Sequence, residues 1–172
     1  MLVKVKIISE QKTSYLNALQ DENYDTNSIS KSIEEKILAS IATPCISQKG
    51  KTNDSIYFLI NDLGNAKNFF TDIVEVSNSI INENLKPRLN INFYCGCELL
   101  NDNSELRVTE KFISRMFDLR LANKIIVTNK FKVFYENIYC NLFSFAVQGE
   151  YNLNEDRNSI KNSMLYTLQS GQ

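Results

Sequence analysis

The stretch that carries most information about the fold is residues 51–60, which reads KTNDSIYFLI. Asp54 lies at the tip of a predicted turn, and the apolar run 56–60 that follows is typical of a buried strand. A carboxylate at the start of an apolar strand can project into a cleft and bind a divalent cation through its oxygens. Asn53-Asp54 is also ordinary turn chemistry between two strands. Asp54 is therefore a candidate metal ligand whose role depends on the residues around it.

Hydrophobic periodicity on both sides of this stretch predicts a mixture of strands and helices. Strands are expected where apolar and polar residues alternate, and helices where apolar residues recur every three or four positions. The predicted strands are Leu2–Ile8, Cys45–Ser47, Ile56–Ile60, Leu89–Cys97, Lys124–Thr128, and two more around Leu142–Gly149 and Ser163–Gln169. The predicted helices are Ser14–Leu19, Ser30–Ala42, Asn65–Asn84, Val108–Leu121 and Lys130–Asn137. This order predicts an α+β fold, with a ferredoxin-like βαββαβ core and helices packed on a mainly antiparallel sheet.

Length and composition predict a single folded domain spanning residues 1–172. Apolar residues make up 43% of the chain and charged residues 23%, which is the balance of an average soluble protein and argues against disorder. The net charge of −1 gives no electrostatic basis for a nucleic-acid or anionic-membrane partner. The apolar runs are far shorter than the roughly 20 residues of a membrane span, and no signal peptide is visible. We therefore expect a cytoplasmic protein without nucleic-acid or membrane partners.

The sequence contains no histidine, which excludes whole classes of mechanism. A Ser-His-Asp or Cys-His nucleophile and any His-ligated metal site are impossible within this chain. The four cysteines, Cys45, Cys95, Cys97 and Cys140, form no Cys-x-x-Cys pair. Cys95 and Cys97 lie in an alternating apolar run, so we interpret the cysteines as buried free thiols rather than redox or metal-binding groups.

Several separated segments resemble, in their order and spacing, the catalytic domain of class III nucleotidyl cyclases, the adenylate and guanylate cyclases. Residues 51–60 are similar to the family's Lys-Thr-x-Gly-Asp-Ser/Ala segment between its second and third strands. The segments that resemble the family's next strand, its arginine-bearing helix, the following strand and the closing hairpin are Leu89–Gly96, Lys111–Met116, Ala122–Thr128, Phe143–Gly149 and Leu165–Leu168. The resemblance covers nearly the whole chain and implies the cyclase fold.

The resemblance also implies two-metal catalysis on a nucleoside triphosphate. In the family, a pair of aspartates holds Mg²⁺ or Mn²⁺ ions that activate the ribose 3′-hydroxyl and neutralise the triphosphate. Asp54 matches the second metal aspartate, and Arg115 matches the arginine that stabilises the transferred phosphoryl group. From the residues alone, Arg115 is equally well explained as a solvated helix residue or as an ion-pair partner of Glu110 or Asp118.

The chain departs from the family's pattern in its metal-binding and phosphate-binding residues. The family's first metal aspartate belongs at the end of the first strand, where this chain reads SEQ at residues 9–11. Glu10 is the available carboxylate, one position late, so its side chain would face the other side of a continuing strand. The family's asparagine four residues before the arginine is replaced by Lys111, which is otherwise explained as a solvated helix lysine. One metal carboxylate is therefore expected to be missing.

The residues that match the family's base-selecting positions also depart from the family's pattern. The family's base-selecting lysine falls on Gly50, which leaves the adjacent Lys51, or Lys49, as the candidate for nucleotide binding. Asp102 or Glu105 could replace the family's base-contacting acid. Because the family builds its sites at a homodimer interface, identical copies of this chain would repeat the same substitutions, whereas a heterodimer with an intact cyclase partner would not.

These observations lead to two hypotheses of different class. In the favoured one, the chain is a catalytically degenerate cyclase-like domain that acts as a regulatory, nucleotide-binding or protein-interaction module in a homodimer or heterodimer. It would bind Mg²⁺ or Mn²⁺ only if nucleotide binding is retained. In the alternative, it is an active but divergent cyclase that makes a cyclic nucleotide from an NTP with a divalent metal, using Glu10. A third possibility is an unrelated ferredoxin-like interaction protein, which a different sheet order would favour.

Overall fold

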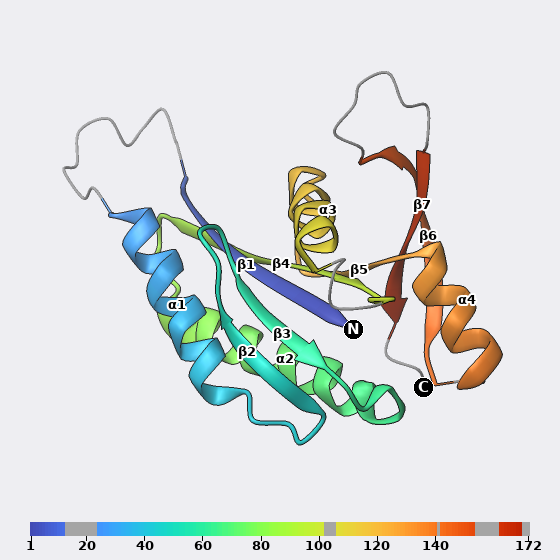
Figure 1. The fold of residues 1–172 in the computed structure, drawn as a ribbon. Helices are drawn as coiled ribbons and strands as arrows, with labels where there is room; N and C mark the ends of the chain where they lie inside the picture. Colours follow the sequence, from blue (N-terminus) through green and yellow to red (C-terminus); the bar gives the residue numbers. More distant parts are fainter. Residues whose placement is uncertain (13–23, 102–105, 141, 154–161, 170–172) are drawn as a thin grey trace.

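The computed structural model describes residues 1–12, 24–101, 106–140, 142–153 and 162–169, in which seven strands form one sheet (Figure 1). The strands are β1 (Leu2–Gln11), β2 (Ile46–Lys51), β3 (Ile56–Ile60), β4 (Leu89–Glu98), β5 (Ile125–Thr128), β6 (Ser144–Asn152) and β7 (Asn162–Gln169). They are ordered β2-β3-β1-β4-β5-β7-β6, and all neighbours are antiparallel except β4 and β5. The order β2-β3-β1-β4 is that of a ferredoxin-like core. The predicted α+β fold with a mainly antiparallel sheet is therefore confirmed.

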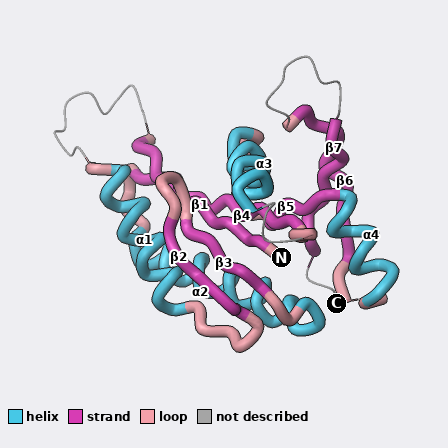
Figure 2. The backbone as a smooth tube through the Cα atoms, in the orientation of Figure 1, coloured by secondary structure: helices cyan, strands magenta, loops and turns pink. Residues whose placement is uncertain are grey.

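The helices cover the two faces of the sheet unequally. They are α1 (Thr26–Ser40), α2 (Ala66–Asn84), α3 (Leu106–Asp118) and α4 (Asn129–Ile138), with a short 3₁₀ turn η2 (Leu63–Asn65) before α2. In Figures 1 and 2, α3 lies on the opposite side of the sheet from α2. The larger core contains buried residues of α1, α2 and α4, whereas the smaller core contains Ile113, Met116 and Phe117 of α3. One face is thus covered by three helices and the other by α3.

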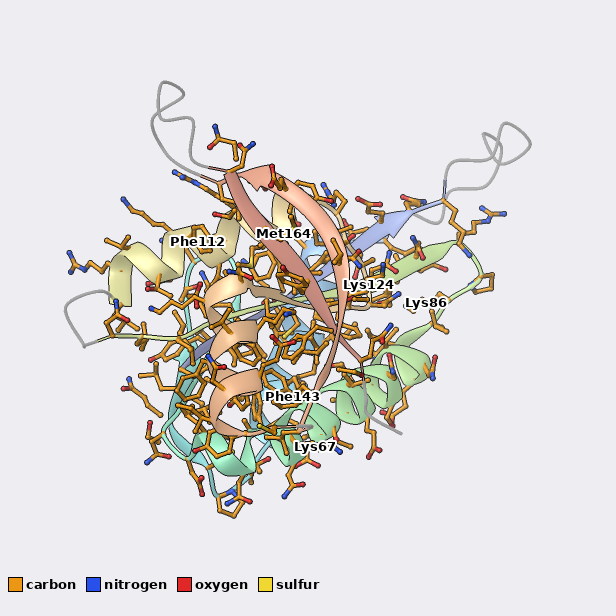
Figure 3. All side chains as sticks on the ribbon, turned by 90° about the vertical axis from the view of Figure 1, so that its right-hand side faces the viewer. Lys67, Lys86, Phe112, Lys124, Phe143 and Met164 are labelled. Atoms are coloured by element: carbon orange, nitrogen blue, oxygen red, sulfur yellow. The ribbon has the colours of Figure 1, made fainter. Side chains whose placement is uncertain are left out.

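Aromatic side chains fill the space between α4, α2 and β6. Phe143 contacts the rings of Phe70, Phe131 and Tyr135, with centroid distances of 5.7, 6.1 and 4.9 Å (Figure 3). Tyr135 is 1% exposed, and its hydroxyl donates a hydrogen bond to the Leu63 carbonyl at 2.9 Å. This bond gives the buried hydroxyl the partner that it needs.

Helix α1 begins four residues before the predicted start at Ser30. Asp25 caps it, because its carboxylate accepts a hydrogen bond from the Ser28 amide at 3.0 Å. An acceptor at this position satisfies one of the free amides of the first turn. The predicted helix Ser14–Leu19 lies outside the described residues. The other elements are found within a few residues of their predicted ends.

The first strand is buried on both faces near its start, whereas alternating apolar and polar residues are typical of a strand with one buried face. Leu2, Val3, Lys4 and Val5 are all buried, and Lys4 is only 1% exposed. Val3 and Val5 face the larger core, while Leu2 belongs to the smaller core under α3. The alternation predicted the strand correctly, but Lys4 faces α3 instead of water.

Three of the four cysteines are buried, and all four are free thiols. Cys45, Cys95 and Cys97 are buried as expected, but Cys140 is exposed near the end of α4. Burial raises the pKa of the Cys95 and Cys97 thiols well above their usual range, so both stay protonated and unreactive at neutral pH.

Among the described helices, none combines the length and hydropathy needed to cross a membrane.

Candidate functional site

Asp54 lies in the turn between β2 and β3, where its carboxylate meets a buried lysine. The Lys4 ammonium is 3.2 Å from Asp54 Oδ1, 2.7 Å from Ser114 Oγ and 3.6 Å from Glu110 Oε1. Lys4 is on β1, while Ser114 and Glu110 are one helical turn apart on α3. The site therefore joins β1, the β2–β3 turn and α3 around one positive charge.

Cross-strand pairing explains why Lys4 faces α3. Lys4 is the register partner of Tyr57 on one side and of Gly96 on the other, and directly opposed residues share a face of the sheet. A Cβ atom on Gly96 would lie 2.5 Å from Ile113 Cγ2 and 3.2 Å from Met116 Sδ. The missing side chain of Gly96 lets α3 pack directly on β4, beside Lys4. Ser114 and Glu110 are thereby brought within reach of the ammonium.

The Asp54 carboxylate is held by hydroxyl groups as well as by Lys4. Thr52 Oγ1 and Ser55 Oγ donate hydrogen bonds to Asp54 Oδ1 at 2.8 and 3.0 Å. Burial alone would raise the pKa of Asp54, but the Thr52 hydrogen bond, the Lys4 charge and the hydrogen bonds from Ser55 and Lys4 outweigh it, so the pKa falls to about 2. Asp54 is therefore ionised at any physiological pH, and the Lys4 ammonium lies beside its charge.

Glu10 and Ser9, at the end of the first strand, have different neighbours from Asp54. The Glu10 carboxylate forms an ion pair with Arg120 at 3.2 Å, and both side chains are more than half exposed. Glu10 shares the face of Lys4 but lies six residues further along β1, about 20 Å for an extended strand. Ser9, on the other face, accepts a hydrogen bond from Ser30 of α1 at 3.0 Å. The end of β1 thus contacts α1 and the residues after α3.

Arg115 and Lys111 lie on α3 next to the residues that contact Lys4. The Arg115 guanidinium donates a hydrogen bond to the Leu153 carbonyl at 2.5 Å, which links α3 to the residue after β6. Glu110, a possible ion-pair partner of Arg115 in the sequence analysis, lies instead near Lys4. Lys111 is exposed. Arg115 thus lies in the last turn of α3 and contacts the backbone just after β6.

The two lysines around Gly50 both contact α1. Lys51 forms an ion pair with Glu35, and both side chains are about half exposed. Lys49 donates hydrogen bonds to the Leu38 and Ile41 carbonyls at 2.6 and 2.5 Å, which satisfies free carbonyls at the end of the helix. Asp102 and Glu105, the candidate base-contacting acids, lie outside the described residues.

Gly50 itself lies beneath the ring of Tyr57. The two residues are register partners, and a Cβ atom on Gly50 would be 2.9 Å from the Tyr57 hydroxyl oxygen. Gln48 Nε2 donates a hydrogen bond to the same hydroxyl at 2.9 Å. A lysine at position 50 would require Tyr57 to move. The aromatic ring covers the strand position to which the resemblance assigned base selection.

Asp54 also borders a polar cleft of about 360 Å³ between the β2–β3 turn, β1 and the start of α1. Its lining residues include the cations Lys6 and Lys31 and the acids Glu34 and Asp54. Glu34 accepts a hydrogen bond from the Ile7 amide at 2.9 Å, and burial raises its pKa. The cleft therefore has both signs of charge.

A larger cavity of about 540 Å³ lies between α2 and the strands β5, β6 and β7. Lys67, Lys124 and Phe143 are among its lining residues (Figure 3). None of the site residues predicted from the sequence lines it. The two hollows are therefore separate features of the molecule.

The described residues around Asp54 do not gather the set of ligands that a divalent metal needs while the Lys4 ammonium is present. A magnesium site uses carboxylate oxygens that face an open, hydrated position. Here the side chains of Lys4, Thr52 and Ser55 all contact Asp54 Oδ1, and Glu10 contacts Arg120. In the described part of the chain, no three His, Cys, Asp or Glu side chains gather to hold a metal ion.

Lys4 was missed by the sequence analysis, although a signal was present. In an alternating strand, a lysine is normally interpreted as facing water, and Lys4 and Lys6 alternate with Val3, Val5 and Ile7. A buried lysine needs an anionic partner. Asp54 was identified as a candidate metal ligand and not as the partner of a lysine, and the separation of 50 residues hides the contact.

Comparisons with known proteins agree on the fold. No protein-family model and no curated protein matches the sequence. A solved structure of adenylate cyclases from Trypanosoma brucei in their monomeric state matches with a TM-score of 0.53 and 11% identity, covering 99% of this chain and 90% of that chain. A structure of an adenylate/guanylate cyclase/hydrolase from Silicibacter pomeroyi matches with a TM-score of 0.49 and 12% identity, covering 98% and 96%. The Trypanosoma brucei match shows that the chain has the adenylate cyclase fold that the sequence resemblance implied.

Proposed function

We propose that this chain is a cyclase-like domain without cyclase activity, which serves as a regulatory module that binds a nucleotide or a protein partner. The observation that carries the proposal is the state of Asp54. One oxygen of the carboxylate that resembles a metal ligand, Asp54 Oδ1, is in contact with Lys4, Thr52 and Ser55. Two-metal catalysis needs carboxylates that are free to hold the ions.

The surroundings of Arg115 and Gly50 support the same proposal. Arg115 donates to a backbone carbonyl of its own chain, and the ring of Tyr57 lies over Gly50. The groups that resemble catalytic and base-selecting residues thus have structural partners. A nucleotide, where it binds, would bring its phosphates to Lys6 and Lys31 in the polar cleft beside Asp54.

The α3 face of the sheet is the surface that we assign to a protein partner. Beyond α3, the side chains of Ile8, Tyr57 and Leu59 are half-buried apolar groups on this face. A second copy, or a cyclase-like or regulatory protein, would cover them. A homodimer would repeat the Lys4–Asp54 pair in both protomers and would not create a metal site. Sedimentation of the wild type and of Tyr57→Ser and Leu59→Ser variants tests this surface.

A binding titration with product analysis tests the function. The purified chain is titrated with ATP, GTP, CTP and UTP at saturating Mn²⁺ by calorimetry, and each mixture is then examined for cyclic nucleotides. Binding without product supports a nucleotide-sensing module, and absence of binding directs the search to protein partners. Sustained, metal-dependent formation of a cyclic nucleotide would refute the proposal. Such a result would leave the divergent cyclase as the better hypothesis.

A further inference from the structure

The Lys4 ammonium is a buried cation held between two carboxylates. Its side chain is 1% exposed, whereas those of Asp54 and Glu110 are 37% and 35% exposed. The acids come from different elements, the β2–β3 turn and α3, and both approach the same nitrogen atom. A lysine is almost never fully buried without such compensation. One ammonium charge is therefore shared by two carboxylates.

Either an ammonium group or a divalent cation can balance the negative charge of the Asp54 and Glu110 carboxylates. Hard divalent cations bind carboxylate and hydroxyl oxygens, and the ammonium has oxygen neighbours of these same kinds from Asp54, Glu110 and Ser114. A metal ion cannot share the position, because it would meet the ammonium charge at close range in a poorly hydrated place. The covalently attached cation is always present, whereas a metal must be supplied.

We propose that Lys4 is a resident counter-ion that replaces a divalent cation at the Asp54–Glu110 pair, so that a latent metal site is kept closed by one side chain. This deepens the proposed function and rests on it. The domain should then be insensitive to Mg²⁺ and Mn²⁺ at this position, and its ligands should bind here without metal. Removal of the ammonium should open the site to divalent cations.

The fold around Lys4 is suited to this role. Gly96 allows α3 to pack closely on β4 beside Lys4, which fixes the positions of Ser114 and Glu110. Thr52 and Ser55 hold Asp54 independently of Lys4. The oxygen atoms should therefore remain near their positions when the ammonium is removed.

The test measures Mn²⁺ binding to the full chain by calorimetry and by the loss of the free Mn²⁺ EPR signal. We compare the wild type with Lys4→Asp, which places a third carboxylate at the site, and with Lys4→Ala, which only removes the ammonium. Because binding to carboxylates strengthens with ligand charge, Lys4→Asp should bind Mn²⁺ more than about tenfold tighter than the wild type, with Lys4→Ala in between. Adding Asp54→Asn to Lys4→Asp should abolish the gain.

Two controls separate this result from general effects of charge. Lys132→Asp introduces the same change of charge on α4, beside Glu136, and should not gain binding. Circular dichroism shows whether each variant folds, and Mn²⁺-dependent thermal stabilisation reports binding in a variant that folds only with metal.

Saturable Mn²⁺ binding by the wild type that is lost in Asp54→Asn would overturn the inference. So would the absence of any gain, in calorimetry and in thermal stabilisation, for both Lys4→Asp and Lys4→Ala. Cyclic-nucleotide formation by the wild type would refute the proposed function instead. Mn²⁺ binding therefore tests the inference about Lys4, and cyclic-nucleotide formation tests the proposed function.

Discussion

Replacing Lys4 by methionine tests the energetics of the buried charge. Methionine keeps most of the apolar length of the side chain but has no ammonium group. In Lys4→Met, the carboxylates of Asp54 and Glu110 lose their common cation, and the Ser114 hydroxyl loses a 2.7 Å hydrogen bond. We expect the variant to fold with a lower free energy of unfolding, because two negative charges then face one another across the site.

The magnitude follows from the exposure of the two acids. Removing one partner of a fully buried ion pair costs about 3–5 kcal/mol. Asp54 and Glu110 are 37% and 35% exposed, so water can solvate both after the change. We therefore expect a loss of about 2 kcal/mol at pH 7. For a domain of this size, that corresponds to a melting temperature lower by roughly 4–8 °C.

The effect should depend on pH in a defined direction. The pKa of Asp54 is lowered from its ordinary 3.8 to about 2 in the folded protein, so its stabilising contribution is complete above pH 3.8 and is lost as the pH falls through 2. The difference between pKa values corresponds to about 2 kcal/mol, which we halve to about 1 kcal/mol because the side chain is partly screened by solvent. The difference in free energy of unfolding between the wild type and Lys4→Met should therefore become smaller as the pH falls from 3.8 to 2.

The assay is urea unfolding followed by circular dichroism at pH 7 and at pH values from 4 down to 2. Lys51→Met is the matched control, since it removes a lysine from an exposed ion pair with Glu35 and should cost less than about 1 kcal/mol. Equal stability of Lys4→Met and wild type at pH 7 would refute the reasoning. A gap that is unchanged at the lowest pH would show that Asp54 does not provide the compensating charge.

Three further substitutions test individual contacts. Gly96→Ala should destabilise the fold by about 1–3 kcal/mol in urea unfolding, because its Cβ would lie 2.5 Å from Ile113 Cγ2; wild-type stability would mean that α3 packs less closely. Tyr135→Phe should cost about 1 kcal/mol by the same measurement, through loss of the hydrogen bond to the Leu63 carbonyl, and a neutral result would contradict that bond. Burial raises the pKa of Glu34 above its ordinary 4.5, so its stabilising contribution is present below pH 4.5 and is lost as the pH rises through the folded pKa. Glu34→Gln should therefore stabilise the protein at pH 7 and not below pH 4.5, and a gain that is independent of pH would contradict the role of ionisation.

Most of the secondary structure could be predicted from the sequence, because it depends on local periodicity. The alternation of residues 89–97 predicted β4, and the apolar spacing of residues 65–84 predicted α2 almost to its ends. The start of α1 was placed too late, since the apolar stripe begins well after the cap at Asp25. Boundaries set by single hydrogen bonds to a polar side chain are not visible in hydrophobic spacing.

The candidate site was predicted less completely, because it depends on contacts between distant segments. Asp54 was identified from its place before a strand, but its cation, Lys4, is 50 residues away and was given no role in the sequence analysis. The search for a second carboxylate led to Glu10, whose charge is instead paired with Arg120. The carboxylate that does share a cation with Asp54 is Glu110, which the sequence offered only as a partner for Arg115.

The sequence by itself determined the class of fold, the absence of histidine chemistry and the position of Asp54 in a turn. These follow from composition and from patterns within a few residues of one another. Only the tertiary structure decided what Asp54 does, because that depends on which charge lies beside it. The packing of α3 on Gly96 buries Lys4 next to Asp54, and a buried ammonium must be neutralised by the nearest carboxylates.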